Sequence, residues 1–443
     1  MKVLLLGSGG REHALAWRIS QSPRLDRLWV AEGNAGTARL ATNLPVDPGD
    51  TLAVVETARS LGIDLVVVGP EVPLANGVID RLAEAGIRGF GPTQAAARIE
   101  SSKGFARAIM QEAGVPGPSF GVFRDERQAL EYLSSCPGPK VVKADGLAAG
   151  KGVLLCPNAE EAAAAVRRCM TEGTFGSAGK TVVIEEFLIG REVSVFAFSD
   201  GETISPLVAA CDYKQVGDGD VGPNTGGMGS YTPPEFWNED LAEEVKRTVI
   251  APVLRQLAGR GTPYRGVLYA GLMLTEKGIQ TLEFNCRFGD PEAQVILPLL
   301  ESDPLEVMSA CAQGTLDQVP VSWRSRAHVG VVMTSGGYPG EYQTGCRITG
   351  LETEIPNSLV FHAGTSQRSS PSGEGPEDPV ATSGGRVLTV VGWGDNLADA
   401  RFNAYRRLEM IHFDGCYYRR DIGEIPSTVE NEAWLPNPVP QSL

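Results

Sequence analysis

The first hundred residues alternate short apolar runs with helix-like stretches, and this alternation limits the possible folds more than any other feature. Apolar runs at 3–6 (VLLL), 28–31 (LWVA) and 64–70 (DLVVVGP) are typical of buried strands. The stretches at 13–19 and 77–86 have helical character, and a glycine ends the second one. Alternating strands and helices predict parallel β-α-β units, so we expect an N-terminal α/β domain built on a parallel sheet.

The remainder of the chain predicts a mixed α+β architecture. A helical stretch from Thr93 to Ala113 is followed by short strands around an alanine-rich helix that begins near Asn158. Residues 366–379 have a disorder-like composition, which predicts a surface insertion. The expected parts are an N-terminal domain at 1–102, a central α+β domain at 103–327 with a compact lobe inserted at about 118–190, a separate small α+β domain at 328–426, and a loose Pro-rich tail at 427–443.

Charge and cysteine usage restrict the partners and the compartment. A net charge of −15 over 443 residues argues against a broad nucleic-acid or membrane surface, because both need positive charge. The eight cysteines never fall at C-x-x-C spacing, which gives no support to a zinc site or a redox dithiol. No apolar run approaches the length of a membrane span, and the N-terminal run is too short for a signal peptide. We therefore expect a cytoplasmic protein that binds neither nucleic acid nor membrane.

The stretch TLEFNCRFGDPE at 281–292 carries a clear chemical signal. If its first part is a strand, Glu283, Asn285 and Arg287 share one face and the apolar residues between them lie on the other. Adjacent carboxylate and amide oxygens suit a hard cation such as Mg²⁺, and an arginine beside them can hold a carboxylate or a phosphate. A solvated polar strand face shows the same alternation, but the following Gly-Asp-Pro-Glu adds carboxylates and a tight turn.

Residues 143–153 (KADGLAAGKGV) have the composition of a phosphate loop without matching the common one. The P-loop needs G-x-x-x-x-G-K followed by Ser or Thr, whereas here the glycines are one residue too close and Gly152 replaces the hydroxyl residue. Lys143 ends a strand, so its amine can point from a fixed element into a cleft. The glycines let backbone N–H groups approach an anion closely. A mobile hairpin that closes over a triphosphate and an ordinary glycine-rich surface hairpin both fit this pattern.

Three further stretches are candidates for ligand contacts. In VVIEEFLIGREVS (182–194) a strand leads into an expected exposed connector, which can read an adenine edge or be two plain surface acids. The polar, glycine-rich loop at 212–229 is either functional or disordered. GSGGREH (7–13) begins like the dinucleotide fingerprint, but Glu12 replaces its third glycine. What remains there is a helix N-terminus that can hold a phosphate.

Together these stretches resemble one enzyme family. The motifs are GSGGREHALAW, GNAGT, VVGPEVPLANG, KADGLAAGKGV, VIEEFL, DYKQVGDGDVGPNTGGMGSY, LYAGLM, LEFNCRFGDPEAQ and GGRVL, in collinear order from Met1 to about Gly423. The chain is similar to the phosphoribosylamine–glycine ligases, also called glycinamide ribonucleotide synthetases, of the ATP-grasp superfamily. The departures are the insertion at 366–379 and the tail, and neither touches a motif. The resemblance implies an ATP-grasp fold in which two α+β lobes clasp the nucleotide.

The resemblance also implies positions for ATP and for a metal ion. By this likeness KADGLAAGKGV covers the phosphates, with Lys143 on the α- and β-phosphates and Lys103 as a second ATP lysine. The other implied ATP contacts are Gly146, Gly150, Lys151, Gly152, the connector residues Glu185, Glu186, Phe187 and Leu188, and Glu192 on the ribose. Glu283 and Asn285 match the family's ligands for Mg²⁺ or Mn²⁺, which agrees with their shared strand face.

The implied reaction joins glycine to 5-phosphoribosylamine at the expense of ATP, in de novo purine synthesis. The products are ADP, phosphate and glycinamide ribonucleotide, and a glycyl phosphate is the intermediate. Lys143, Arg287 and Asp290 are the implied catalytic residues, the last two as partners of glycine. The implied contacts of the ribosylamine are Gly9, Gly10, Glu71, Asp212, Lys214, Asn224, Thr225, Gly226, Gly227 and Arg386. We expect a monomer whose partners are these small molecules.

Three other functions fit parts of the sequence. A dinucleotide-dependent oxidoreductase accounts for the β-α-β units, but Glu12 in the fingerprint and the missing nicotinamide-domain signal count against it. An ATP-grasp ligase for a different acid or amine shares the nucleotide motifs. A catalytically silent nucleotide-binding regulator is expected to lose metal-ligand types, whereas Glu283 and Asn285 are both present.

Overall fold

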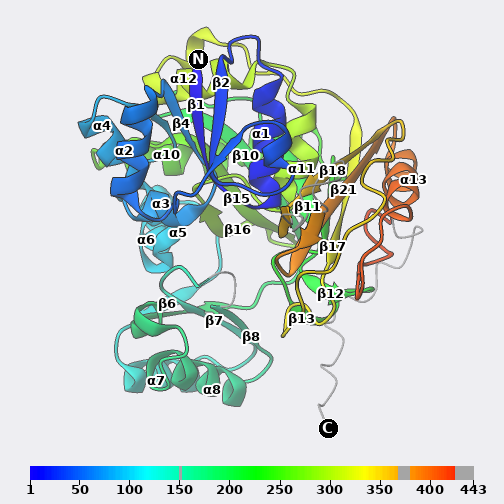
Figure 1. The fold of residues 1–443 in the computed structure, drawn as a ribbon. Helices are drawn as coiled ribbons and strands as arrows, with labels where there is room; N and C mark the ends of the chain where they lie inside the picture. Colours follow the sequence, from blue (N-terminus) through cyan, green and yellow to red (C-terminus); the bar gives the residue numbers. More distant parts are fainter. Residues whose placement is uncertain (149–151, 368–379, 425–443) are drawn as a thin grey trace.

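The N-terminal region is a five-stranded parallel sheet (Figure 1). The computed structural model describes residues 1–148, 152–367 and 380–424. The strands are β1 (Lys2–Gly7), β2 (Arg27–Glu32), β3 (Thr42–Leu44), β4 (Leu65–Val68) and β5 (Arg88–Phe90), in the order β3-β2-β1-β4-β5. Every neighbouring pair is parallel, so the predicted N-terminal α/β fold is confirmed.

Helices cover both faces of this sheet because β1 is apolar on both faces. The helices are α1 (Gly10–Ser20), α2 (Thr51–Leu61), α3 (Glu71–Ala75) and α4 (Val78–Glu84). Leu4 and Leu6 belong to the core that includes α2 and α4, whereas Leu5 belongs to the core that includes α1. A strand buried on both faces has a continuous apolar sequence, as β1 does. Since α1 begins where β1 ends, the first glycine-rich motif lies at the carboxyl edge of the sheet.

The predicted single helix from Thr93 to Ala113 is wrong, because the chain forms two helices there. These are α5 (Gln94–Ser101) and α6 (Lys103–Ala113). Ser102 between them is extended, with φ −140° and ψ 110°, and its hydroxyl accepts from Phe105 N. Serine competes with helical hydrogen bonding in this way and favours the cap position. The break places Lys103 at the first turn of α6.

Residues 118–190 contain a four-stranded sheet with two helices on its outer side, at the bottom of Figure 1. The elements are β6 (Phe120–Phe123), α7 (Glu126–Ser135), β7 (Lys140–Ala144), β8 (Val153–Cys156), α8 (Ala159–Met170) and β9 (Val182–Glu186). Val142 and Ile184 pack against α7 and α8, so the alternate residues Lys143 and Glu185 face the other way. This lobe thus turns its polar strand face toward the rest of the molecule.

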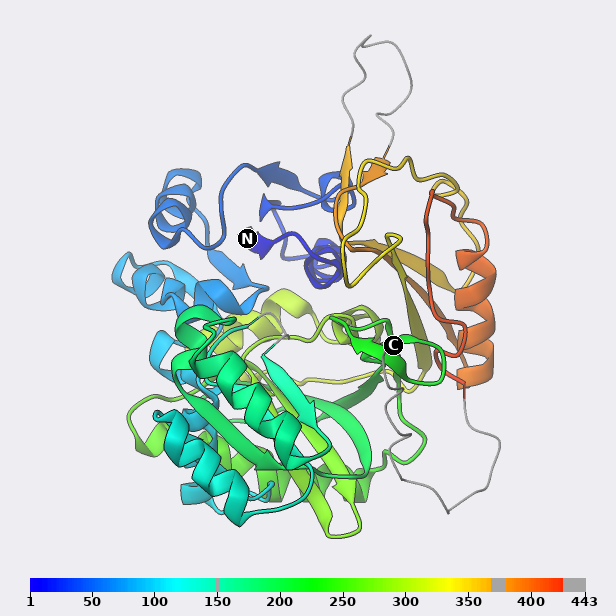
Figure 2. The same ribbon diagram turned by 90° about the horizontal axis from the view of Figure 1, so that it is seen from below.

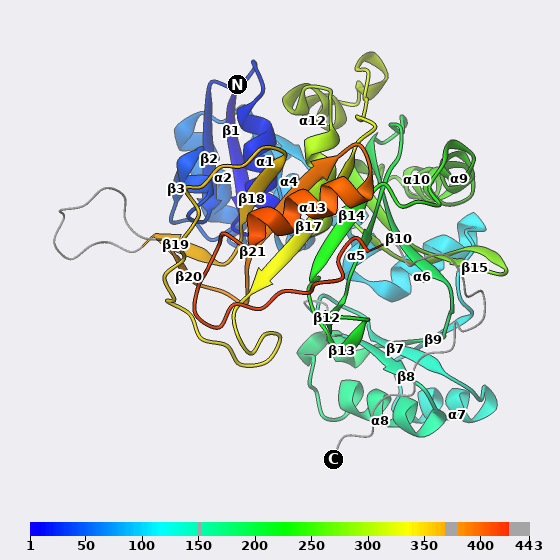
Figure 3. The same cartoon turned by 90° about the vertical axis from the view of Figure 1, so that its right-hand side faces the viewer.

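One eight-stranded sheet runs through the rest of the molecule (Figure 3). In spatial order its strands are β16 (Gly278–Asn285), β15 (Arg265–Thr275), β10 (Arg191–Asp200), β11 (Val208–Asp212), β14 (Gly229–Thr232), β17 (Ala327–Thr334), β21 (Arg386–Gly394) and β18 (Ser358–His362). Because β17 pairs with β14, the sheet continues across residue 328, where the sequence predicts a separate domain. Pairing of this kind satisfies strand edges that would otherwise stay open, so the C-terminal strands extend the central sheet. The domain boundaries remain predictions.

The remaining elements surround this sheet. They are β12 (Gln215–Gly217), β13 (Val221–Asn224), α9 (Glu239–Val245), a π turn (Lys246–Ile250), α10 (Ala251–Gly259), α11 (Glu292–Ile296), α12 (Pro304–Gln313), β19 (Thr365–Gln367), β20 (Val380–Thr382) and α13 (Leu397–Leu408). Seen from below, the N-terminal region and β19 lie side by side (Figure 2), and Ala35 N donates to the Thr365 carbonyl at 3.3 Å. Within the described ranges, every helix is too short or too polar to cross a membrane.

Candidate active site

A cavity of about 1300 Å³ lies between the 118–190 lobe and the large sheet, and most of the predicted site residues line it. The predicted residues in the lining are Glu71, Lys103, Lys143, Gly146, Gly152, Glu185, Glu186, Phe187, Leu188, Glu192, Asp212, Lys214, Asn224, Thr225, Gly226, Glu283, Asn285, Arg287, Asp290 and Arg386. Of the described candidates, Gly9, Gly10 and Gly227 are not part of this lining. Gly150 and Lys151 lie outside the described residues.

Lys143 faces the cavity from β7 and is held by a buried ion pair. Its Nζ lies 2.8 Å from Glu185 Oε2 and donates to the Leu282 carbonyl at 3.1 Å. Glu185 also accepts from Arg107 Nε at 2.7 Å, so two cations share one carboxylate. Burial lowers the pKa of Lys143 and outweighs the opposing charge of Glu185. Burial acts to raise the pKa of Glu185, but Lys143 and Arg107 outweigh it and lower that pKa.

The expectation of an exposed connector at 185–188 is wrong. β9 continues through Glu186, and Glu185 is buried on the strand face that also carries Lys143. Glu186, Phe187 and Leu188 are half-buried and line the cavity. The sequence pattern fails here because the partner that draws Glu185 inward is an arginine on α6, far away in the chain.

A β-bulge in β16 lies at the centre of this region. The register between β15 and β16 shifts by one residue, so that Thr281 and Glu283 are paired and Leu282 between them is not. The carbonyl of Leu282 is therefore available to side chains, and it accepts from Arg107 Nη2 at 2.8 Å as well as from Lys143. The bulge thus gives Lys143 and Arg107 a shared acceptor, the carbonyl next to Glu283 in the chain.

Glu283 and Asn285 line the cavity while Phe284 between them lies in the core, as strand alternation predicts. Glu283 Oε2 lies 3.3 Å from Lys103 Nζ. Burial acts to raise the pKa of Glu283, but Lys103 and Lys143 outweigh it and lower the pKa to about 2. In the described part of the chain, no group of three or more His, Cys, Asp or Glu side chains forms a metal cage. An ionised carboxylate and an amide oxygen fit Mg²⁺, which takes its other ligands from phosphate and water.

Arg287 is fixed by two carboxylates from the N-terminal helices. Its Nη2 lies 2.9 Å from Glu100 Oε1, and its Nε lies 3.4 Å from Glu71 Oε2. Glu100 is buried and also accepts from Cys286 N at 2.8 Å. Burial acts to lower the pKa of Arg287, but the two glutamates outweigh it and raise that pKa. An anion that reaches Arg287 must therefore share it with these carboxylates.

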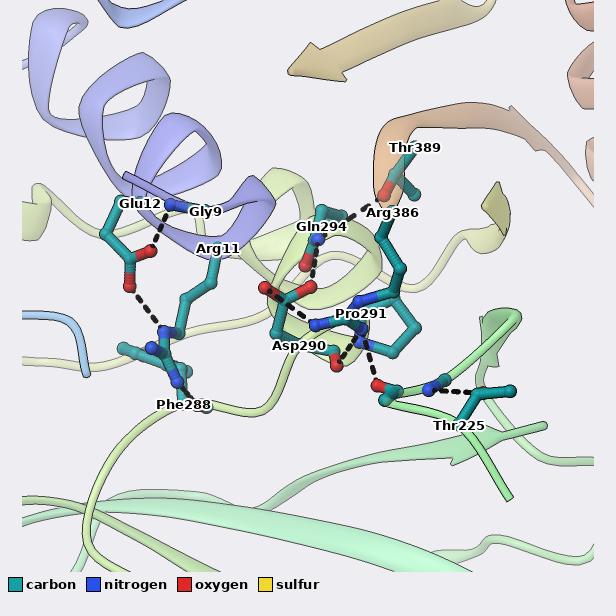
Figure 4. Close-up of polar contacts among 12 residues, drawn as sticks. Gly9, Arg11, Glu12, Thr225, Phe288, Asp290, Pro291, Gln294, Arg386 and Thr389 are labelled. Carbon is teal, nitrogen blue, oxygen red and sulfur yellow. Dashed lines mark hydrogen bonds and ion pairs between the residues drawn. The ribbon is translucent and has the colours of Figure 1, made fainter. Parts of the chain in front are cut away.

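Asp290 lies where three segments of the chain meet (Figure 4). Arg386 Nη1 donates to the carbonyls of Gly226 and Asp290, the latter at 2.7 Å, and its Nη2 lies 3.4 Å from Asp290 Oδ2. Gln294 Nε2 donates to Asp290 Oδ1 at 2.7 Å. Burial acts to raise the pKa of Asp290, but Arg386 outweighs it and lowers that pKa. Arg386 therefore links the 212–229 loop to the turn that follows β16.

The N-terminus of α1 is capped by its own glutamate. Gly9 N donates to Glu12 Oε2 at 2.7 Å, and Glu12 Oε1 lies 2.5 Å from Arg11 Nε. Arg11 Nη1 donates to the Phe288 carbonyl at 3.1 Å (Figure 4). The residue that replaces the third glycine of the dinucleotide fingerprint thus occupies the end of the helix at which that motif binds phosphate. This geometry argues against a dinucleotide site.

Lys214 is a third lysine of the cavity, and it is paired with two carboxylates. Its Nζ lies 2.5 Å from Glu192 Oε1 and 3.2 Å from Asp212 Oδ1. Burial acts to lower the pKa of Lys214, but Asp212 and Glu192 outweigh it and raise the pKa well above its usual value. Thr225 donates to the Lys214 carbonyl from its N at 2.7 Å and from its Oγ1 at 2.8 Å. These bonds tie the two arms of the 212–229 loop together.

Three buried polar side chains, those of Tyr269, Glu292 and Ser194, form a cluster near Asp212. Tyr269 Oη donates to Glu292 Oε1 at 2.9 Å, and Ser194 Oγ lies 3.2 Å from the same oxygen. Burial, and after it the charge of Asp212, raise the pKa of Glu292. The region around Lys214 therefore contains more acidic groups than cations.

Comparison with known proteins identifies the family. Three profiles described as phosphoribosylglycinamide synthetase match in order, for the N domain (residues 1–100), the ATP-grasp (A) domain (101–293) and the C domain (328–425). A phosphoribosylamine–glycine ligase of Nostoc sp. is 48% identical over 428 residues, which are 96% of this chain and 99% of the relative. The chain belongs to the phosphoribosylglycinamide synthetase family. The family prediction made from the motifs is confirmed.

Solved structures support the same assignment of fold. The crystal structure of a Thermotoga maritima phosphoribosylamine–glycine ligase matches with a TM-score of 0.81 at 34% identity, and the match covers 95% of this chain and 100% of the other. The biotin carboxylase domain of Hydrogenobacter thermophilus 2-oxoglutarate carboxylase, solved with MgADP, matches with a TM-score of 0.70 at 15% identity over 94% and 91% of the two chains. The predicted ATP-grasp fold is confirmed.

Several residues at this synthetase site were not predicted. Arg11, Glu100, Tyr269 and Glu292 line the cavity, and Arg107 supports Lys143 through Glu185. Arg11, Tyr269 and Glu292 lie inside the family motifs, which is a signal that sequence reasoning left unused. Arg107 lies four residues after Lys103 on α6, so the two share one helix face. Glu100 has no comparable local signal.

Proposed function

We propose that this chain catalyses the ATP-dependent ligation of glycine to 5-phosphoribosylamine, with glycinamide ribonucleotide, ADP and phosphate as products. The observation that carries the proposal is membership of the phosphoribosylglycinamide synthetase family along the chain, with relatives that share its full length. The cavity adds physical support, because it gathers a cation cluster, a pair of oxygen ligands and an acidic cluster around one volume. The reaction is a step of purine biosynthesis.

We infer that the ATP phosphates bind at Lys143 and Lys103. Lys143 projects from a strand and is held by Glu185 and the Leu282 carbonyl, so its position is fixed before the substrate arrives. Preorganised positive charge of this kind stabilises a phosphoryl group in transfer. Gly146, Gly150, Lys151 and Gly152 of the hairpin, the segment Glu185, Glu186, Phe187 and Leu188, and Glu192 on the ribose complete the proposed ATP contacts.

Glu283 and Asn285 are the proposed ligands of Mg²⁺ or Mn²⁺. The low pKa of Glu283 keeps its carboxylate charged at neutral pH, and both side chains lie in the cavity that contains Lys143. An ion held there would supply positive charge to the phosphates of ATP. The ADP and magnesium of the biotin carboxylase structure support a divalent ion in this fold.

The proposed chemistry has two steps and needs no protein nucleophile. The carboxylate of glycine attacks the γ-phosphorus of ATP and expels ADP, which forms glycyl phosphate. The amine of phosphoribosylamine then attacks the glycyl carbonyl, loses a proton and expels phosphate. Arg287 and Asp290 are the proposed partners of glycine's carboxylate and amine, and positioning is their main contribution. Closure of the site protects the acyl phosphate from water.

Phosphoribosylamine is proposed to bind along the 212–229 loop. Asp212, Lys214 and Asn224 line the cavity there, and the loop is anchored by Arg386. The further proposed contacts are Gly9, Gly10, Glu71, Thr225, Gly226, Gly227 and Arg386. In the structure Glu71 is paired with Arg287, which brings this proposed contact close to that of glycine.

Substrate omission tests the proposed function. ADP release is measured with ATP and Mg²⁺ while glycine or freshly generated phosphoribosylamine is left out in turn. We expect ADP release to need both, with glycinamide ribonucleotide as the product. Turnover with a different acid in place of glycine would move the chain to another substrate, and no ADP under any combination would refute ligase activity.

We also propose that the chain is a monomer in the cytoplasm. All eight cysteines are free in the structure, which is typical of a reducing compartment. Light scattering during size-exclusion chromatography tests the oligomeric state, and a mass of about twice 47.1 kDa would contradict the monomer.

A further inference from the structure

The 212–229 loop is held by a segment near the described C-terminal end. Residues 417–423 (YYRRDIG) follow α13 and lie beside β12 and β13 (Figures 1 and 3). Arg420 N donates to Asp218 Oδ1 at 2.7 Å. This segment is far from the loop in sequence, and none of its side chains has a role in the proposed reaction.

Arg419 is the centre of this contact and is fully buried. Its Nη1 donates to the Gln215 carbonyl at 3.0 Å and to Asp220 Oδ1 at 2.6 Å. Its Nε and Nη2 donate to the two oxygens of Asp421 at 2.8 and 2.5 Å. The guanidinium carbon lies 4.7 Å from the ring centre of Tyr213. A planar guanidinium can make all of these contacts at once, and a lysine cannot.

The charge of Arg419 is satisfied within the protein. Burial acts to raise the pKa of Asp421, but the hydrogen bonds from Arg419 outweigh it and lower that pKa to about 2. Asp220 provides a second carboxylate, which is largely exposed and lies at the cavity lining. With two carboxylate partners, Arg419 offers no excess positive charge to a phosphate. Its contacts therefore indicate a structural link to the loop rather than an anion site.

The loop needs such a link because its own pairing is weak. β12 and β13 form an isolated two-stranded sheet with an irregular register, and the residues of β13 are exposed. A lone two-stranded hairpin is marginally stable in water. Tyr213 and Gln215, both contacted by Arg419, are the immediate neighbours of Lys214 in the chain. Arg419 thus contacts the ring of Tyr213 on one side of Lys214 and the backbone carbonyl of Gln215 on the other.

We propose that Arg419 is a positioning residue for phosphoribosylamine, which it serves by fixing the β12–β13 hairpin and with it Lys214 and Asn224. Among the described residues the cavity lining does not include Arg419, so it acts through the loop and does not touch the substrate. Arg386 anchors the same loop at Gly226, at its other end. This inference rests on the proposed function, because the proposed function supplies phosphoribosylamine as the ligand of the loop.

The test compares Arg419→Met with Arg420→Met. Arg420 is the adjacent exposed arginine, and the hydrogen bond that its backbone N donates to the loop survives the substitution. We expect Arg419→Met to raise the KM for phosphoribosylamine about tenfold or more and to change the KM for ATP less than about twofold. Arg420→Met should change neither. Arg419→Lys should restore only part of the loss, because it keeps the charge without the fork.

The contradicting results are distinct. Equal increases in both KM values would mean that Arg419 supports the fold in general and does not position phosphoribosylamine. Unchanged KM values would mean that Arg419 has no effect on the site. If Arg419→Met does not fold, Asp220→Asn replaces it, since this side chain is 64% exposed. Because Asp220 also lines the cavity, two readouts are needed: its loss should raise the KM for phosphoribosylamine about threefold, and it should speed hydrogen exchange of residues 213–224. An unchanged KM in that variant would overturn the proposal.

Failure of the proposed function is recognised separately. Wild-type protein that forms no glycinamide ribonucleotide would refute the ligase reaction and leave the structural part of the inference testable. Hydrogen exchange of residues 213–224 then tests whether Arg419 braces the loop, because Arg419→Met should speed exchange there and Arg420→Met should not. Equal exchange in both variants would refute the bracing role as well.

Discussion

The pKa values of two lysines in one cavity are shifted in opposite directions. Burial lowers the pKa of Lys143, whose surroundings include the cations Arg107 and Lys103. The pKa of Lys214 is raised, because Asp212 and Glu192 outweigh its burial. Burial therefore does not decide what such a lysine can do, and the balance of carboxylates and cations around it does. The Lys143 cluster, which is Lys143 with Lys103 and Arg107, has more cations than its paired carboxylates and suits phosphates. The Lys214 cluster, which is Lys214 with Asp212 and Glu192, is acidic and suits an amine.

The largest expected effect is at the Lys143 cluster. Lys143→Met removes the cation that we place on the phosphates, and kcat/KM for ATP should fall about 1000-fold, the loss typical of a preorganised charge. Steady-state kinetics with glycine and phosphoribosylamine saturating measure it. Lys140→Met is the matched control, because Lys140 lies on the same strand and, among the described residues, its Nζ donates to carbonyls of nearby prolines. A loss of similar size in both variants would contradict the assignment.

The same cluster should have a pH-dependent effect on stability. Glu185→Gln removes the carboxylate between Lys143 and Arg107 and should lower the free energy of unfolding by about 3 kcal/mol at pH 7. The folded pKa of Glu185 lies below its ordinary value of 4.5, so its stabilisation is present above pH 4.5 and is lost as the pH falls through the folded pKa. Denaturant unfolding from pH 7 to pH 3 should show the difference between wild type and variant shrinking. A constant difference would contradict this account.

A smaller and more selective effect is expected at the Lys214 cluster. Asp212→Asn keeps the shape of the side chain and removes one of the two charges that hold Lys214. The KM for phosphoribosylamine should rise about tenfold while the KM for ATP stays within about twofold. Initial rates with each substrate varied in turn measure the split. A rise confined to ATP would exchange the roles of the two clusters.

The smallest effect is expected from the hydroxyl of Tyr269. Tyr269→Phe removes the hydrogen bond to Glu292 without removing the ring, and the free energy of unfolding should fall by about 1 kcal/mol. Denaturant unfolding at pH 7 measures it. A loss much larger than this would mean that the buried acidic group depends on the hydroxyl as a network.

Local sequence patterns predicted the parts of the site that lie on regular strands. Alternation along β16 puts Glu283 and Asn285 on one face, and the structure has them together in the cavity. The parallel N-terminal sheet follows in the same way from apolar runs such as 3–6. These features depend on residues that are neighbours in the chain, so a local sequence pattern predicts them. The family motifs then supplied the remaining site candidates, whose roles stay predictions.

The errors concern contacts between distant segments. Glu185 is buried because Arg107 on another element neutralises it. The pairing of β14 with β17 is also a contact between distant segments, and no local pattern shows it. Arg419 likewise acts on a loop about 200 residues earlier in the chain. Only the helix break at Ser102 had a local signal, since serine favours a cap position.

The most direct test of the two-cluster account is a crystal structure of the chain with Mg²⁺, a non-hydrolysable ATP analogue and glycinamide ribonucleotide. We expect the nucleotide phosphates to contact Lys143 and Lys103 and the ion to bind at Glu283 and Asn285. The new amide should lie beside the Lys214 cluster. Phosphates bound at Lys214, with Lys143 still paired only to Glu185, would contradict it.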